Sequence, residues 1–381
     1  MKIQHFRQTN KAKYESAKLQ DRIHGLGIRT KLKGWLDLSE VDITQPKFTY
    51  EPKHFFENEE ILVLDLETLQ KSDLSMKKYI LDNLFNMEIK QTEKTDYLHF
   101  AKSHVRIIIF PDNFKADGAI KLKKHLKGDF LGHTFIYVGK NTDVDILYNV
   151  TGEKTKNVNI CTDFVQVHIH DDSKAEFINL KNVPDSYYLH GRVHSIIHSD
   201  VEGHIATADF GGRLITNETI TRLQGDNSKV FTDNLFYAEE GEEYDINGAS
   251  IHNGKSSYSL LSGKGVLEKA KAMSRGLVKI ESPAFDSDGY QKADLLMLDD
   301  NSRAIAIPDL EIHNDEVRCS HGSTISRLEE DKIFYLQSRG LSEQESKRKL
   351  VEGFFFPILE NIKSEETRKE IEILLGERIN K

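Results

Sequence analysis

The sequence predicts a mainly β protein whose strand-rich core is flanked by helical regions. From about Val105 onward, short runs rich in β-branched and aromatic residues follow one another at intervals of roughly ten residues. Single Gly, Asn or Asp residues separate many of these runs, and helical periodicity is nearly absent among them. Because only Pro184 and Pro283 fall between Pro111 and Pro308, strand can follow strand without losing a hydrogen-bond donor.

Closely spaced strands without intervening helices fit a sandwich, a barrel or a parallel β-helix. Hairpins are typically marked by Asn-Gly or Asp-Gly at the reversals, whereas the spacing here is closer to the rungs of a solenoid. No crisp repeat consensus stands out. Periodicity alone therefore favours the β-helix only slightly.

Changes in residue composition and periodicity divide the chain into three predicted regions. Residues 1–100 are expected to be mixed and largely helical, since residues 76–87 (MKKYILDNLFNM) place apolar side chains at helical spacing. Residues 101–325 form the predicted strand-rich core. Residues 326–381 are again expected to be helical.

The predicted C-terminal helices carry clear start and stop signals. Gly340 suits the residue after a helix end, and Ser342 with Glu345 forms a capping box that opens the next helix. Pro357 is expected to kink or end that helix, and Ser364 to cap a last one.

Composition narrows the class of function. The formal charge of −9, from 52 basic and 61 acidic residues, argues against a nucleic-acid partner, which requires an excess of Lys and Arg. No apolar run approaches the ~20 residues of a membrane span, and the opening residues lack the apolar stretch of a secretory signal. A cytoplasmic location is expected. With only Cys161 and Cys319, one chain cannot supply four thiolates to an iron–sulfur cluster.

The candidate ligands are Cys319 and His321. If this segment is extended, their side chains share one face of a strand and offer a sulfur and a nitrogen to one iron or zinc ion. On spacing alone the pair is more often a small buried thiol and a hydrogen-bonded histidine than a metal site.

The stretch 303–340 resembles the C-terminal signature of the SufB/SufD family, scaffold proteins of the SUF iron–sulfur cluster assembly system. The resemblance lies in a P-x-L-E-I strand at Pro308–Ile312, a C-S-H-G-S-T turn at Cys319–Thr324 and an F-Y-L-x-S-R-G helix end at Phe334–Gly340. It implies a right-handed parallel β-helix flanked by helical N-terminal and C-terminal regions. It also implies a scaffold rather than an enzyme.

The resemblance further implies roles for single residues. In SufD-like members the histidine of this motif lies at the interface with SufB, where the nascent cluster is built, so that role maps to His321; Cys319 becomes a possible ligand or sulfur acceptor. The C-terminal helices of the family bind the ATPase SufC. Candidates for that contact, or for the core behind it, are Phe334, Tyr335, Phe354 and Phe355. Expected partners are SufC, a SufB-like chain or a second copy, and a sulfur donor.

The sequence departs from SufB where SufB carries cysteines. Ala304 and Ala293 stand at two such positions, and Ser320 and Gly322 replace the acidic neighbours of the histidine. The segment 273–281 nevertheless reads closer to SufB. We therefore expect a SufD-like chain, or a divergent paralogue, that cannot assemble a cluster unaided.

Three other patterns compete with this interpretation. The histidine-rich stretch 168–204 is the alternative: a stand-alone β-helical metalloenzyme could use His168, His170, His190, His194, His198 and His204. Gly248–Ser256 resembles a phosphate-binding loop but has the wrong spacing and context, and neither a nucleotide nor a flavin is expected for this chain alone. The pairs Asp286/Asp288 and Asp299/Asp300 are more typical of turns than of a polysaccharide-cleaving site.

Overall fold

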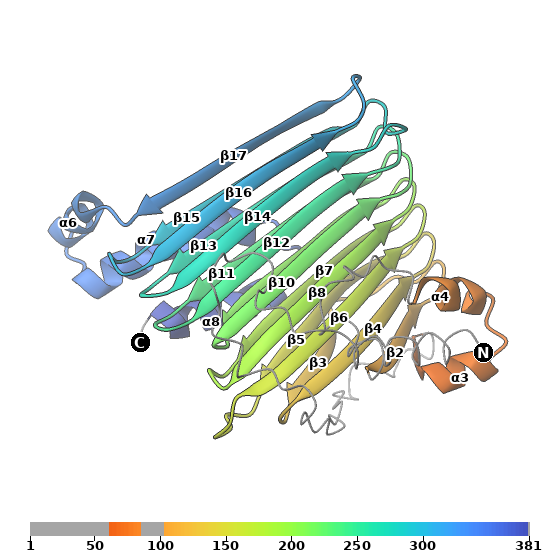
Figure 1. Ribbon diagram of the computed structural model, residues 1–381, viewed down its shortest axis with the longest axis horizontal. Helices are drawn as coiled ribbons and strands as arrows, with labels where there is room; N and C mark the ends of the chain where they lie inside the picture. Colours follow the sequence, from red (N-terminus) through yellow and green to blue (C-terminus); the bar gives the residue numbers. More distant parts are fainter. Residues whose placement is uncertain (1–60, 85–102, 380–381) are drawn as a thin grey trace, which may run out of the picture.

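The computed structural model describes residues 61–84 and 103–379, and its main body is a parallel β-solenoid of about eight turns (Figure 1). Successive strands alternate between two sheets, so each strand pairs with the strands two places before and after it. This arrangement confirms the predicted mainly β class and the parallel β-helix.

The first sheet contains β1 (Leu62–Asp65), β2 (His104–Phe110), β4 (Phe130–Val138), β6 (Asn159–Ile169), β8 (Tyr187–Ile197), β10 (Leu214–Leu223), β12 (Glu243–His252), β14 (Lys271–Ile280) and β16 (Arg303–Ile312). The second contains β3 (Ile120–Leu126), β5 (Asp143–Gly152), β7 (Lys174–Val183), β9 (Glu202–Gly211), β11 (Lys229–Ala238), β13 (Tyr258–Leu267), β15 (Asp288–Met297) and β17 (Arg318–Arg327). All pairs are parallel except β1 with β2.

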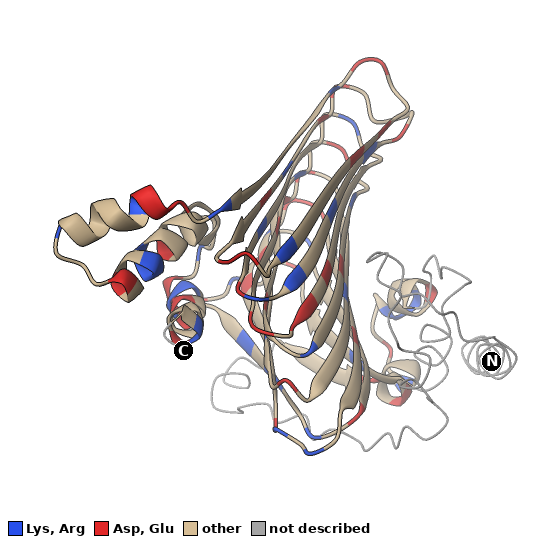
Figure 2. Ribbon diagram, turned by 60° about the vertical axis from the view of Figure 1, so that its left-hand side comes forward, with Lys and Arg blue, Asp and Glu red and all other residues tan. Residues whose placement is uncertain are grey.

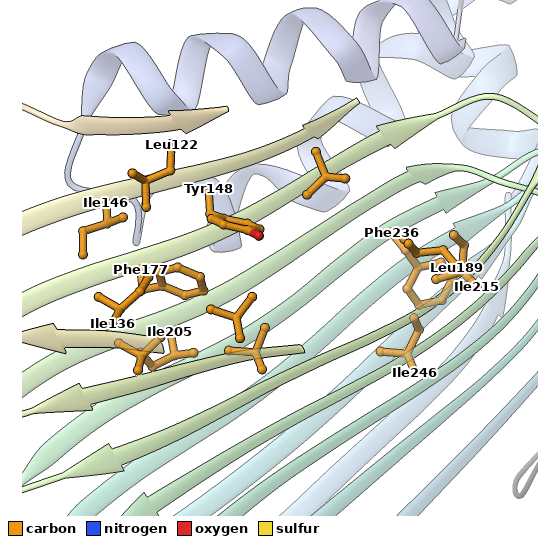
Figure 3. Packing of buried hydrophobic residues seen from close by; sticks show 14 of the residues in the cluster. Leu122, Ile136, Ile146, Tyr148, Phe177, Leu189, Ile205, Ile215, Phe236 and Ile246 are labelled. Atoms are coloured by element: carbon orange, nitrogen blue, oxygen red, sulfur yellow. The ribbon is translucent and has the colours of Figure 1, made fainter. Parts of the chain in front are cut away.

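The space between the sheets is filled by alternate side chains of the strands. Phe177, Phe236 and Ile246 are among the apolar residues that meet there, each almost completely buried (Figure 3). Burial of one such side chain contributes roughly 1.5–3 kcal/mol. The interior also holds two buried ion pairs, among them Lys181 Nζ with Asp209 Oδ1 at 2.7 Å.

The turns carry a repeat that the strand sequences do not reveal. At one end of the solenoid a residue with positive φ recurs about once per turn: Asn113, Asn141, Asp172, Asp200, Asn227, Ser256 and Asp286. Asn and Asp tolerate this backbone conformation better than other side chains. Neighbouring turns are joined by their side chains, as in the 2.7 Å bond from Asn141 Nδ2 to Asn113 Oδ1.

The C-terminal helices are α6 (Glu330–Ser338), α7 (Glu343–Leu359) and α8 (Glu365–Ile379). α7 and α8 pack on the outer face of the second sheet, where Val351, Phe355 and Ile371 join a cluster with Leu180 and Leu235. The predicted capping box at Ser342 is present, and α7 ends two residues after Pro357.

Towards the N-terminus, the described segment holds β1, α3 (Leu66–Lys71) and α4 (Lys77–Asn83). The helix predicted within residues 76–87 corresponds to α4. The remaining predictions for residues 1–60 and 85–102 lie outside the described residues.

Candidate functional site at the open end of the solenoid

The last turn of the solenoid is formed by two strands that, within the described residues, each pair on one side only. β16 pairs with β14 and β17 with β15, which leaves one edge of each strand open (Figure 1). Three apolar side chains of this turn stay 44–46% exposed: Ile305, Ile312 and Ile325. We call β16 and β17 together the open end.

The open edge of β17 offers an unbroken row of backbone groups. The N–H of Arg318 donates to the Ser287 carbonyl of the neighbouring turn at 2.9 Å. Because backbone groups alternate sides along a strand in a parallel ladder, the odd-numbered residues turn their N–H groups away from β15. These residues are Cys319, His321, Ser323 and Ile325.

The open edge of β16 is interrupted. The N–H of Arg303 donates to the Ala270 carbonyl at 3.0 Å, so here the even-numbered residues face the open side. Pro308 occupies one of these positions, where its missing N–H costs no bond within the chain. The two edges are therefore unequal as partners for another strand.

Cys319 and His321 lie two residues apart on β17 and share the inward face, as the sequence predicts. The Cys319 side chain packs beside Val278, Ile280 and Leu310. Burial, with a smaller contribution from Asp288, raises the pKa of its thiol. At neutral pH the group is therefore protonated and a weak ligand in the isolated chain.

The imidazole of His321, by contrast, is exposed at the open end. Its backbone partner on β15 is Gln291, so the ring stands one turn beyond that residue. One exposed nitrogen and one protonated thiol cannot hold a cluster. Within the described residues, Ala304 and Ala293 add no ligand to this pair.

The four aromatic residues predicted to contact a partner, or to form the core behind that contact, fall into two groups. Phe334 and Tyr335 lie on α6, where they are 72% and 57% exposed and no residue is buried. Phe355 is fully buried between α7 and the second sheet, and Phe354 packs partly against the same cluster. The Lys264 ammonium lies 4.4 Å from the Phe354 ring and donates to its carbonyl.

Phe334 and Tyr335 are thus available for contact, whereas Phe354 and Phe355 belong to the packing between α7 and the second sheet. Figure 2 shows α6 standing away from the solenoid. Sequence reasoning missed Phe356 on α7, which is 58% exposed.

Comparison with known proteins identifies the family. The model described as "SUF system FeS cluster assembly, SufBD core domain" matches residues 123–354, more than half of the chain. The chain belongs to the SufB/SufD family.

Similar proteins carry matching names. An iron–sulfur cluster assembly SufBD family protein of Staphylococcus epidermidis is 23% identical over 262 residues, which cover 68% of this chain and 56% of that protein. The iron–sulfur cluster assembly protein SufD of Escherichia coli is 29% identical over 171 residues, 45% of this chain and 40% of SufD. The chain spans about half the length of the curated relatives it matches. The predicted likeness to SufD is confirmed.

In this SufB/SufD chain three histidines of the stretch lie around Tyr79. The Tyr79 hydroxyl of α4 lies 2.8 Å from His168 Nδ1 and 3.1 Å from His198 Nε2, and the His170 ring stacks on His198. Burial lowers the pKa of His168 to about 3 and that of His170 to about 4, so both rings are neutral.

The other histidines of the stretch point to different neighbours. His190 contacts Thr216, His194 contacts Glu218, and His204 lies on the opposite sheet. Nowhere in residues 61–84 and 103–379 do three His, Cys, Asp or Glu side chains converge as a metal site. The described structure thus gives the metalloenzyme alternative no support.

The two remaining patterns are structural. Gly248 lies inside β12, and the following turn leads into another strand rather than into the helix that a phosphate loop requires. Asp286 takes a left-handed turn conformation, and the Asp299 carboxylate accepts N–H groups of its own turn, as predicted for turn residues. No helix of the described chain is long and apolar enough to cross a membrane.

Sequence reasoning missed one residue next to the open end. Gln291 is only 2% exposed and lies inside the solenoid between β15 and β16. Its place in an alternating strand, with Gly289 and Ala293 on the same face, is the signal that could have found it.

Proposed function

We propose that this chain is a SufD-like scaffold subunit of the SUF iron–sulfur cluster assembly system. It contributes geometry and one or two ligands to a nascent cluster rather than catalytic turnover. The observation that supports this most is the open end, which presents His321 on an unpaired strand edge.

The open end pairs with a SufB-like chain or with a second copy of this chain. A long unpaired strand edge with exposed apolar side chains is a liability in a monomer, because it invites pairing with another strand. Pairing along β17 would satisfy its free N–H groups and cover Ile325. It would also bring His321 to a subunit boundary.

At that boundary His321 serves as a ligand of the nascent cluster, and the partner supplies most of the others. Cys319 joins it only if contact with the partner frees its thiol from the apolar pocket. In the paired state His321 becomes covered, and a shift of the interface would expose it.

The shift is driven by a SufC-type ABC ATPase that docks at α6. A helix of nine residues with no buried side chain is marginal on its own in water. The exposed rings of Phe334 and Tyr335 give a partner an apolar surface to cover. Sulfur arrives from a separate donor, and ATP is bound by the ATPase subunit.

The ligand role is tested with His321→Ala in the complex of this chain with a SufB-like chain and a SufC-type ATPase. Loss of even an outer-shell partner of a metal ligand typically costs about 10- to 100-fold. For loss of the ligand itself we therefore expect anaerobic cluster formation, followed by visible absorbance, to slow by at least roughly tenfold.

His313→Ala is the matched control, because His313 is also exposed and follows the neighbouring strand β16. It should leave the rate unchanged. A parental rate for His321→Ala would refute the ligand role, and a stable, stoichiometric [4Fe–4S] cluster on the purified chain alone would refute the need for a partner.

A further inference from the structure

The interior of the last two turns contains an amide that joins the two sheets. Gln291 extends from β15 across the solenoid, and its Nε2 donates to the Asp309 carbonyl of β16 at 2.7 Å. The side chain is 2% exposed. It therefore ties the strand beneath β17 directly to the other strand of the open end.

Glycines on the facing sheet make room for such long side chains. A Cβ atom on Gly248 would lie 2.8 Å from Leu261 Cδ1, and one on Gly276 would lie 2.0 Å from Gln291 Oε1. Gly248 and Gly276 are backbone partners in adjacent turns, as are Leu261 and Gln291. A glycine thus faces a long side chain in two successive turns.

The same two columns continue into the open end. Gly276 is paired with Pro308 on β16, and Gln291 is paired with His321 on β17. His321 is therefore the next member of the column of long side chains, and Pro308 the next member of the column of small ones. Gln291 thus occupies the position on β15 directly next to His321 on β17.

We propose that Gln291, seated against Gly276, is a positioning residue that fixes the separation of β16 and β17 and thereby the place of His321. A buried amide held by a hydrogen bond favours one arrangement of its surroundings, which an apolar side chain does not. The consequence for cluster assembly rests on the proposed function, but the effect on strand separation does not.

The separation can be measured by pulsed electron resonance between spin labels on Glu311→Cys and Ser320→Cys, both exposed positions of the open end. Cys319→Ser removes the competing thiol, and Cys161 is buried. In Gln291→Met, which has similar volume but no N–H donor, we expect the distance distribution to broaden roughly twofold. Lys292→Met on the exposed face of the same strand is the matched control and should not change it.

Rescue by pH separates positioning from a general loss of packing. A carboxylate at position 291 cannot donate to the Asp309 carbonyl, whereas a protonated carboxyl group can. In Gln291→Glu the distribution should therefore narrow on acidification, with no such change in Gln291→Met. Gly276→Ala should broaden it as well, since its Cβ displaces Gln291.

An unchanged distribution in Gln291→Met would overturn the proposal, as would a broad distribution in Gln291→Glu at every pH. Broadening in Gln291→Met, with slower cluster formation in the complex, supports it. If broadening occurs but His321→Ala leaves cluster formation intact, the ligand role of His321 fails while the spacing role of Gln291 stands.

Discussion

The middle turns of the solenoid and the stretch from Arg303 to Gly340 differ in how far each is covered. Strands β4 to β15 pair on both sides, and their interior-facing residues are almost all buried. In β16, β17 and α6, by contrast, no apolar residue is fully buried. This uncovered stretch is also where the sequence resembles the SufB/SufD signature most closely.

Packing explains the residues of the middle turns, because their inward-facing side chains have only to be apolar, of suitable size and compatible with a β-strand. Packing does not explain an exposed imidazole, an exposed phenylalanine on a free helix or a proline on a strand edge. The proposed function offers a reason for these features, namely contacts with other subunits, and the following predictions test it.

The largest effect on the free energy of unfolding is expected at the contact between α7 and the second sheet. Phe355→Ala removes a fully buried ring and should lower the free energy of unfolding by about 3–5 kcal/mol. Phe334→Ala on α6 should change it by less than about 0.5 kcal/mol but abolish co-purification with the SufC-type ATPase. Denaturant titration and affinity capture measure the two quantities, and equal losses of stability would erase the contrast.

A second effect, on the pH dependence of the free energy of unfolding, is expected at His204 beneath the turn between α7 and α8. His204 lies 2.9 Å from both Glu176 and Asp233, and the Asn361 side chain and Lys363 N–H contact the same carboxylates. Although burial alone would lower it, the two carboxylates raise the pKa of His204 to about 9.

Since the folded pKa lies above the ordinary value of 6.5, this stabilisation is complete below about pH 6.5 and disappears as the pH rises through about 9. In this window the free energy of unfolding of the parent should fall by up to about 1.4 kcal/mol per pH unit relative to His204→Gln. Urea titrations at several pH values measure the difference, and a constant difference would contradict the assignment.

Much of the fold could be predicted from the sequence, because many of its features depend on residues that are close together in the chain. The capping box at Ser342, the stop at Gly340 and the alternation of β17 each depend on a few neighbouring residues. The recurring positive-φ residues of the turns were harder to predict, because Asn113 and Asn141 contact each other only after the chain has completed a full turn of the solenoid.

The candidate site could be predicted only in part, for a similar reason. The place of Cys319 and His321 on one strand face follows from their spacing. The apolar side chains that keep the Cys319 thiol protonated come from β14 and β16. The space that the Gln291 side chain occupies depends on Gly276 of the preceding strand. Likewise, the run of three phenylalanines does not reveal that only Phe355 is fully buried.

The central claim, that the open end is a subunit interface, is tested most directly by a pair of proline substitutions in β17. The N–H of Ser323 points to the open edge, whereas that of Thr324 points to β15. Ser323→Pro should therefore remove only a bond to a partner, while Thr324→Pro should destabilise the chain by about 3 kcal/mol.

Sedimentation of this chain, alone and mixed with a SufB-like chain, is the deciding measurement. We expect the parent to form a dimer in one of these samples and Ser323→Pro to stay monomeric in both, with an unfolding midpoint close to that of the parent. A dimer that persists in Ser323→Pro, or a parent that is monomeric in both samples, would contradict the account.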